Sequence, residues 1–183
     1  MGKAVVGFIA GALLVYLLLN APNDTHTHGN LSEDPEYVAN KAVVETMLQA
    51  YVDEDFEAWA ATVSDTVKYG PSAYKYPASL FASGTKEDFS HSVRSGMDEF
   101  EDMSIAQAVY LPGLDGVTAE PDGSVRVYWQ LEVTHTATGV TVDPRFYANF
   151  DIDGGQITTA TFFGDAGGVA NHIANTSTDV EKR

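Results

Sequence analysis

The sequence contains no cysteine and few basic residues. The absence of cysteine excludes disulfides, zinc–thiolate sites, iron–sulfur clusters and cysteine nucleophiles. Lysine and arginine number 10 against 26 aspartate and glutamate residues, which gives a formal net charge of −16. This balance argues against nucleic-acid binding, because phosphate groups require a basic surface. It also disfavours docking on anionic lipid through a basic patch.

The residues that are present fit one folded domain with short flanking segments. Hydrophobic residues make up 44% and aromatic residues 11% of the 183 positions, too many for a disordered chain. The length is typical of a single domain that can bury a core.

An uncharged run of 16 residues, 4–19, follows Lys3 near the N-terminus. Its length lies between that of a signal-peptide core and that of a membrane-spanning helix. The poor cleavage signature at Leu19-Asn20-Ala21 favours a transmembrane anchor over residues 1–21, and a cleaved signal peptide is the alternative. Since Lys3 is the only basic residue before the run, we expect the domain outside the cytoplasm, membrane-anchored or, after cleavage, secreted or periplasmic.

Residues 22–34 have the polar composition of a linker. His26 and His28 lie two positions apart there, with no third candidate ligand nearby, so the sequence predicts no metal site.

Residues 35–65 and 85–100 show the helical period. Pro35 opens a first helix whose apolar residues recur at spacings of three and four, as Val44, Met47, Leu48 and Tyr51. A second, shorter helix follows Asp55 and leads into a strand at 66–69. Thr85 to Asp88 resembles a capping box, which predicts a third helix. Residues 70–84 between them are predicted to form a long loop.

From residue 104 onward the period changes from 3.6 to 2, which indicates strands. We expect strands at 104–111, 117–120, 125–136 and 156–164, with a further strand ending at Asp153 before a Gly-Gly hairpin turn. Helices first and an antiparallel meander afterwards define an α+β domain over residues 35–166. Residues 167–183 are predicted to form a flexible C-terminal tail with room for a short helix.

Three segments carry a resemblance to a known family. Residues 47–69 resemble a two-helix opening in which an acidic break precedes an aromatic residue and Trp59. Residues 85–89 match the start of that family's third helix, and residues 132–165 match its two closing hairpins, including an Asp-Gly-Gly turn. On these residues the chain resembles the SnoaL-like domains of the nuclear transport factor 2-like superfamily. These segments mark a fold and contain no catalytic signature.

The resemblance implies a cone, in which a curved antiparallel sheet wraps around about three N-terminal helices and leaves a cavity. It also implies that the exposed sheet face pairs two copies. Members include ketosteroid isomerases, cyclases, dehydratases and non-catalytic modules. The carboxylates of the ketosteroid isomerase pattern are replaced by Lys68 to Pro71 and by Phe146, so that activity is not expected.

His135 and Asp143 are the candidate catalytic pair. They flank a turn at Gly139, and antiparallel strands would bring them near the same end of the sheet. A carboxylate beside an imidazole raises the imidazole pKa and orients the ring for proton transfer. The alternative is a solvated histidine at the rim and an aspartate in the turn.

Four aromatic residues are candidates for the ligand pocket: Tyr69, Trp129, Tyr147 and Trp59. Tyrosine can donate a hydrogen bond to a developing oxyanion, although such residues more often fill sheets and cores. The sequence predicts no cofactor. The resulting hypothesis is a domain that binds a small, partly apolar molecule, with cofactor-free acid–base chemistry of the isomerase, cyclase or dehydratase type if it is an enzyme. The alternative is a dimerisation or interaction module with a filled cone.

Overall fold

The computed structural model describes residues 30–70 and 84–180, without the side chains of 177–180. The predicted anchor 1–21, most of the linker 22–34 with His26 and His28, and most of the predicted loop 70–84 lie outside the described residues. Among the described residues, no helix has the length and hydropathy needed to cross a membrane.

The helices match the periodic segments of the sequence. A short 3₁₀ helix, η1 (Leu31–Glu33), precedes α2 (Pro35–Val52), α3 (Phe56–Ala61) and α4 (Lys86–Glu99). The Asp34 side chain caps α2 by accepting hydrogen bonds from the backbone N–H groups of Glu36 and Tyr37. At the start of α4 the predicted capping box is present, with Thr85 and Asp88 each bonded to the other's backbone.

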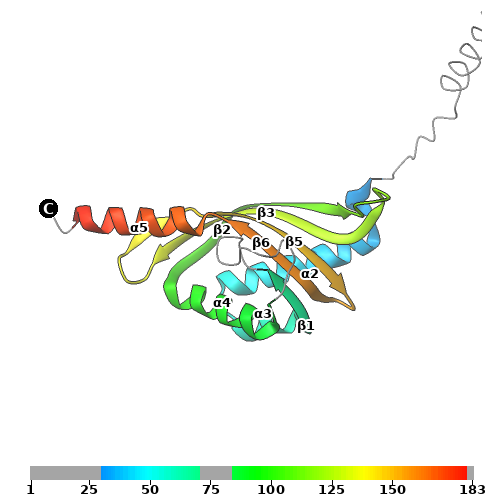
Figure 1. The fold of residues 1–183 in the computed structure, drawn as a ribbon, viewed down its shortest axis with the longest axis horizontal. Helices are drawn as coiled ribbons and strands as arrows, with labels where there is room; N and C mark the ends of the chain where they lie inside the picture. The colour runs from blue at the N-terminus through cyan, green and yellow to red at the C-terminus, as the bar shows by residue number, and fades with distance from the viewer. Residues whose placement is uncertain (1–29, 71–83, 181–183) are drawn as a thin grey trace, which may run out of the picture.

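The strands form one sheet in the order β1-β6-β5-β3-β2, and β4 pairs with β3 outside this path. The strands are β1 (Val63–Gly70), β2 (Phe100–Leu114), β3 (Pro121–His135), β4 (Val140–Val142), β5 (Arg145–Asp153) and β6 (Gln156–Gly164). The sequence predicts an antiparallel sheet, but β1 lies parallel to β6, so the sheet is mixed. Helices α2, α3 and α4 cover one of its faces (Figure 1).

Two segments differ from the sequence prediction. Residues 117–120 do not form a separate strand; they belong to the turn between β2 and β3. The Asp115 side chain there accepts hydrogen bonds from the N–H groups of Val117 and Thr118, which holds the backbone in a turn. The predicted tail forms a 15-residue helix, α5 (Ala166–Val180), which extends beyond the end of the sheet (Figure 1).

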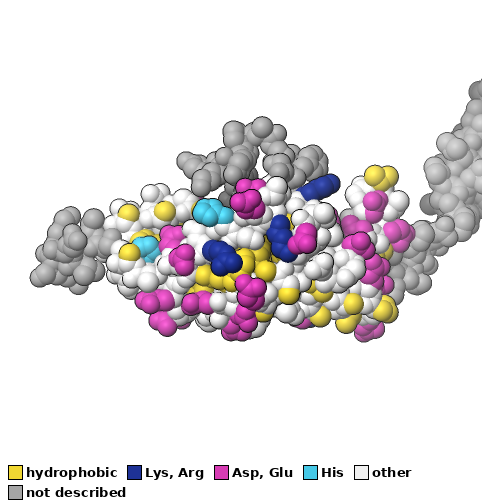
Figure 2. All heavy atoms as spheres, turned by 90° about the horizontal axis from the view of Figure 1, so that it is seen from below, with side chains coloured by type: hydrophobic (Ala, Val, Ile, Leu, Met, Phe, Trp, Pro, Cys, Tyr) yellow, Lys and Arg dark blue, Asp and Glu magenta, His cyan; other side chains and the backbone are white. Residues whose placement is uncertain are grey.

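The core lies between the helical layer and the inner face of the sheet. On β3, residues Val125, Val127, Trp129, Leu131 and Val133 are buried at every second position, as the period of 2 predicts. α5 contributes Ile173, which is buried, and the partly buried Val169 one turn earlier. Acidic side chains outnumber basic ones on the helical side of the surface (Figure 2).

Candidate functional site

A cavity of about 590 Å³ lies between the helices and the inner face of the sheet. Drug-sized ligands typically occupy cavities of roughly 300–1,000 Å³. Aromatic side chains from α3, β1, α4, β3, β5 and β6 form much of its wall: Trp59, Tyr69, Phe89, Trp129, Phe146 and Phe162. Aliphatic side chains form another part of the cavity wall: Met47, Leu48, Val93 and Leu131. Ala166 and Gly167, at the start of α5, also line it.

The aromatic wall is built from rings in mutual contact. Tyr69 stacks on Phe89 with centroids 4.5 Å apart and ring planes 8° apart, and the edge of Trp59 meets Phe89 at 4.8 Å. On the sheet side, Trp129 stacks on Phe146 at 5.1 Å. Such pairs favour fixed orientations over free rotation. The cavity therefore presents planar apolar surfaces on both its helical and its sheet side.

Among the described residues, three hydroxyl groups interrupt this apolar lining. The Tyr69 hydroxyl donates to the Ser92 Oγ at 3.0 Å, which joins β1 to α4 across the cavity wall. The third hydroxyl belongs to Tyr51 on α2. Burial, together with the negative charge of Glu99, raises the pKa of Tyr51 to about 12. Tyr51 is therefore protonated at neutral pH and serves as a neutral hydrogen-bonding group.

Gly96 on α4 makes room for the Tyr51 hydroxyl. A Cβ atom at position 96 would collide with the hydroxyl oxygen and would lie 3.3 and 3.4 Å from the ring atoms Cζ and Cε2. The position of Tyr51 in the cavity wall thus depends on the absence of a side chain on the neighbouring helix.

The lining can bind and orient a molecule, but it carries no side chain that titrates near neutral pH within the described residues. Hydroxyls that stay protonated can donate hydrogen bonds to a carbonyl or phenol oxygen. No group of three or more histidine and acidic side chains in the described part of the chain is arranged to hold a metal ion.

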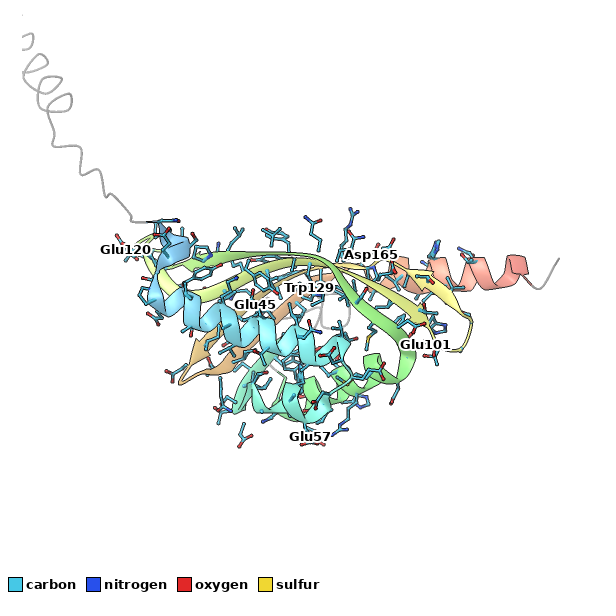
Figure 3. All side chains as sticks on the ribbon, turned by 180° about the vertical axis from the view of Figure 1, so that it is seen from behind. Glu45, Glu57, Glu101, Glu120, Trp129 and Asp165 are labelled. Carbon is cyan, nitrogen blue, oxygen red and sulfur yellow. The ribbon has the colours of Figure 1, made fainter. Side chains whose placement is uncertain are left out.

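Three of the four predicted pocket residues line the cavity, namely Trp59, Tyr69 and Trp129 (Figure 3 labels Trp129). Tyr147 requires a correction, because it lies on the opposite, outer face of the sheet. There its ring packs 4.7 Å from Tyr128 and 5.7 Å from Phe163. Neighbouring residues of a strand point to opposite faces, so the inward Phe146 places Tyr147 outside.

The structure does not bring His135 and Asp143 together. His135 pairs with Val140 in the β3–β4 ladder. Val142, the residue before Asp143, pairs with Val133. Continuing this register, Asp143 lies about three residues along β3 from His135, roughly 10 Å at the rise of a strand. The His135 Nδ1 contacts the Thr138 hydroxyl at 2.8 Å, and its Nε2 lies 3.9 Å from a Glu99 carboxylate oxygen. Asp143 is exposed.

Sequence reasoning missed several lining residues. Ser92 gave no signal beyond its position one helical turn after Phe89; its side chain is exposed, yet it lines the cavity. Phe162 could have been found from the period of the last strand, and Tyr51 from the apolar stripe of the first helix. Ala166 is the last residue of the predicted domain and Gly167 the first of the predicted tail, so no sequence pattern connects them with a cavity.

Comparison of the sequence with protein-family models and with curated protein sequences finds no match. Comparison of the fold with solved structures finds clear likenesses. A proposed polyketide cyclase from Xanthomonas campestris pv. campestris is 16% identical with a TM-score of 0.56, over 76% of this chain and 97% of that chain. A nuclear transport factor 2-like protein from Burkholderia xenovorans is 12% identical with a TM-score of 0.52, over 73% and 95%.

A third similar structure is that of TerC, co-crystallised with polyporic acid. It is 17% identical with a TM-score of 0.56, over 74% of this chain and 98% of that chain. These likenesses define a domain with helices packed inside a curved sheet. The chain has the nuclear transport factor 2-like fold, which confirms the α+β cone expected from the sequence resemblance.

Proposed function

We propose that this domain binds a small, predominantly apolar molecule with an aromatic or similarly planar body. The observation that carries the proposal is the cavity of about 590 Å³, walled by stacked aromatic rings and supplied with the Tyr69–Ser92 hydroxyl pair. A few convergent polar groups in an apolar cavity are typical of small-molecule sites. A cavity of this size argues against the alternative of a filled cone.

The structural neighbours support the same proposal. Their names include polyketide cyclase and a complex with polyporic acid. Each of these small-molecule functions belongs to the neighbour concerned, and at 16–17% identity the likeness establishes the fold alone. They support the proposal because a protein of the same fold, TerC, was co-crystallised with a small organic molecule.

Binding is better supported than catalysis. The described lining offers hydroxyl donors, so a cofactor-free reaction in this cavity would depend on polarising a ligand carbonyl through Ser92 and Tyr69. His135 lies on the same face of β3 as Trp129 and Val133 but outside the described lining, so it is a candidate acid or base only for a ligand that extends beyond that lining. The isomerase, cyclase or dehydratase chemistry expected from the resemblance belongs to this part of the proposal.

A direct binding test can use the two tryptophans. The sequence contains two, and both line the cavity, so intrinsic fluorescence reports on this site. The probe is 2-acetonaphthone, a flat bicyclic ketone, titrated into the full chain in a non-ionic detergent. We expect saturable quenching of tryptophan fluorescence, with a Kd confirmed by calorimetry. Absence of saturable binding by both methods would contradict the proposal.

A matched pair of variants separates cavity binding from partition of the probe into detergent. Ala166→Trp places a large side chain at a lining position near the start of α5, whereas Ala170→Trp places it one turn farther along. Both alanines are exposed, so neither change disturbs the core. We expect at least tenfold weaker binding, by calorimetry, for Ala166→Trp and less than a twofold change for Ala170→Trp.

A second proposal concerns the outer face of the sheet, which we infer pairs two copies of the chain. Exposed apolar side chains lie together there across β2, β3 and β6: Val109, Leu111, Tyr128 and Phe163. Tyr128 is 52% exposed. Sedimentation velocity in a density-matched detergent should give a dimer, and Tyr128→Glu should give a monomer. Val117→Glu, which changes an exposed valine in the β2–β3 turn, should remain a dimer.

The location of the domain is a third proposal, which rests on the sequence alone. We propose that residues 1–21 anchor the chain with its domain outside the cytoplasm, or direct its export if they are cleaved. Alkaline extraction of membranes from expressing cells tests this, because an anchored chain stays in the membrane pellet. Intact mass spectrometry identifies a cleaved product, and full-length chain in the cytosolic fraction would contradict both forms of the proposal.

A further inference from the structure

This inference rests on the proposed function and concerns the charge of the ligand. We propose that the cavity selects an uncharged molecule over an anionic one of the same shape, and that Ser92 donates a hydrogen bond to a carbonyl or hydroxyl oxygen of that molecule. The selection follows from three features: a lining without cationic side chains among the described residues, a carboxylate near the Tyr51 hydroxyl, and a capped helix terminus at the edge of the cavity.

The first feature is the chemistry of the lining. Its polar side chains within the described residues are the hydroxyls of Tyr51, Tyr69 and Ser92. An anion that leaves water for this cavity loses its hydration and gains no ion pair from these groups, which is a large cost. A ketone or phenol loses far less hydration and needs one hydrogen-bond partner.

Ser92 can provide that partner. Its oxygen accepts the hydrogen bond from the Tyr69 hydroxyl at 3.0 Å, so the serine's own proton is left to donate in another direction. Donation from Tyr69 to Ser92 also polarises the serine hydroxyl and strengthens its bond to a ligand. The Tyr69–Ser92 hydroxyl pair is therefore best suited to donate a hydrogen bond to a neutral acceptor on the ligand.

The second feature is a negative charge behind the cavity wall. Glu99, at the last position of α4, lies about one helical turn after Gly96, against which the Tyr51 hydroxyl packs, and its charge opposes a negative charge on that hydroxyl. Burial and the negative charge of Glu99 together raise the pKa of Tyr51. A ligand carboxylate placed beside the same hydroxyl would experience the same repulsion. The net charge of −16 adds a long-range contribution of the same sign.

The third feature concerns the N-terminus of α5, a group in the described lining that would otherwise favour an anion. Ala166 and Gly167 begin α5 and line the cavity, and a helix N-terminus carries a partial positive charge of about half a unit. The Asp165 carboxylate already occupies this terminus, since it accepts a hydrogen bond from the Gly168 N–H at 2.8 Å. Figure 3 shows Asp165 where β6 passes into α5. A full negative charge thus outweighs the dipole at this edge.

The test compares two ligands of nearly the same shape on the full chain by calorimetry. They are 2-acetonaphthone, which is neutral, and 2-naphthoate, which is an anion at pH 7.5. We expect 2-acetonaphthone to bind at least tenfold more tightly, a difference of about 1.4 kcal/mol. Glu99→Gln should reduce this ratio two- to fivefold, and the reduction should shrink as salt is added, because Glu99 is half exposed. Glu120→Gln, which removes the same charge in the β2–β3 turn, should leave the ratio unchanged (Figure 3).

Ser92→Ala tests the hydrogen bond separately. It should weaken 2-acetonaphthone at least threefold and leave naphthalene, which has no acceptor, within twofold of its value for the unchanged protein. Equal affinity for the ketone and the carboxylate would overturn charge selection while leaving the proposed binding function intact. Failure of both ligands to bind would overturn the proposed function and the selection together.

Discussion

The close packing of Tyr51 against Gly96 can be tested by adding a single methyl group. The change is Gly96→Ala in α4, where a Cβ atom would collide with the Tyr51 hydroxyl oxygen. In the interior of a helix, alanine is favoured over glycine by about 0.8–1 kcal/mol. Overpacking in a well-packed region typically costs about 1–3 kcal/mol. The two effects have opposite signs, and the steric one is the larger.

We therefore expect Gly96→Ala to lower the free energy of unfolding, by up to about 2 kcal/mol. In a Tyr51→Phe background the colliding oxygen is absent, and the nearest remaining ring atoms lie at 3.3 and 3.4 Å, where a small shift suffices. The same substitution should there raise the free energy of unfolding, by up to about 1 kcal/mol. The coupling between the two changes should be about 1–3 kcal/mol.

The assay is urea unfolding of the four proteins of this double-mutant cycle, followed by tryptophan fluorescence. Gly167→Ala is the control for helix propensity alone, because a Cβ atom there meets nothing closer than an Asp165 oxygen at 3.8 Å. If Gly96→Ala stabilised the unchanged protein as much as it stabilises the Tyr51→Phe protein, the assigned contact between Gly96 and the Tyr51 hydroxyl would be refuted.

Three further predictions follow from described contacts. Thr85→Ala removes the capping box of α4 and should cost about 1 kcal/mol in urea unfolding, whereas Thr85→Ser should cost less than half of that. Because the folded-state pKa of Tyr51 is raised to about 12, stability should fall as pH rises above 10, and less steeply in Tyr51→Phe; parallel pH profiles would contradict this. His135→Ala should leave the 2-acetonaphthone Kd within twofold, because His135 lies outside the cavity lining; a tenfold loss would contradict that placement.

Local signals predicted most of the secondary structure. A few neighbouring residues predict the start of α2 at Pro35 and the capping box of α4 at Thr85. Both helices begin where predicted. The Gly154-Gly155 turn also lies where predicted, with φ angles of +56° and +78° that favour glycine. These features depend on short-range backbone chemistry, which is why the sequence alone suffices to find them.

Pairings between distant segments could not be predicted in the same way. The parallel alignment of β1 with β6 joins the two ends of the fold, and nothing in either strand specifies the direction of its partner. The length of α5 was also missed, because Gly167 and Gly168 disfavour a helix. Burial of Ile173 against the rest of the domain offsets that weak propensity.

In the candidate site, too, local features could be predicted and long-range pairings could not. Tyr69 is one of the four aromatic residues predicted for the ligand pocket, and it lines the cavity. The pairing of His135 with Asp143 required a register between β3 and the following strand, and the structure instead places Val140 opposite His135. A difference of a few residues in register separates two side chains by a distance that no local pattern reveals.

The parallel pairing of β1 with β6 also constrains how the chain folds. The Gln156 side-chain amide donates to the Ala61 carbonyl across 95 positions, and the Ile157 N–H donates to Thr62 at the start of the same alignment. During synthesis β1 emerges early, whereas β6, the strand that pairs with it among the described strands, is made last. Bringing the two strands together costs loop-closure entropy before their hydrogen bonds lower the free energy. Folding should therefore be slow for a domain of this size. Phe162 on β6 contacts Tyr69 on β1, so this part of the aromatic wall forms only when the two strands have come together.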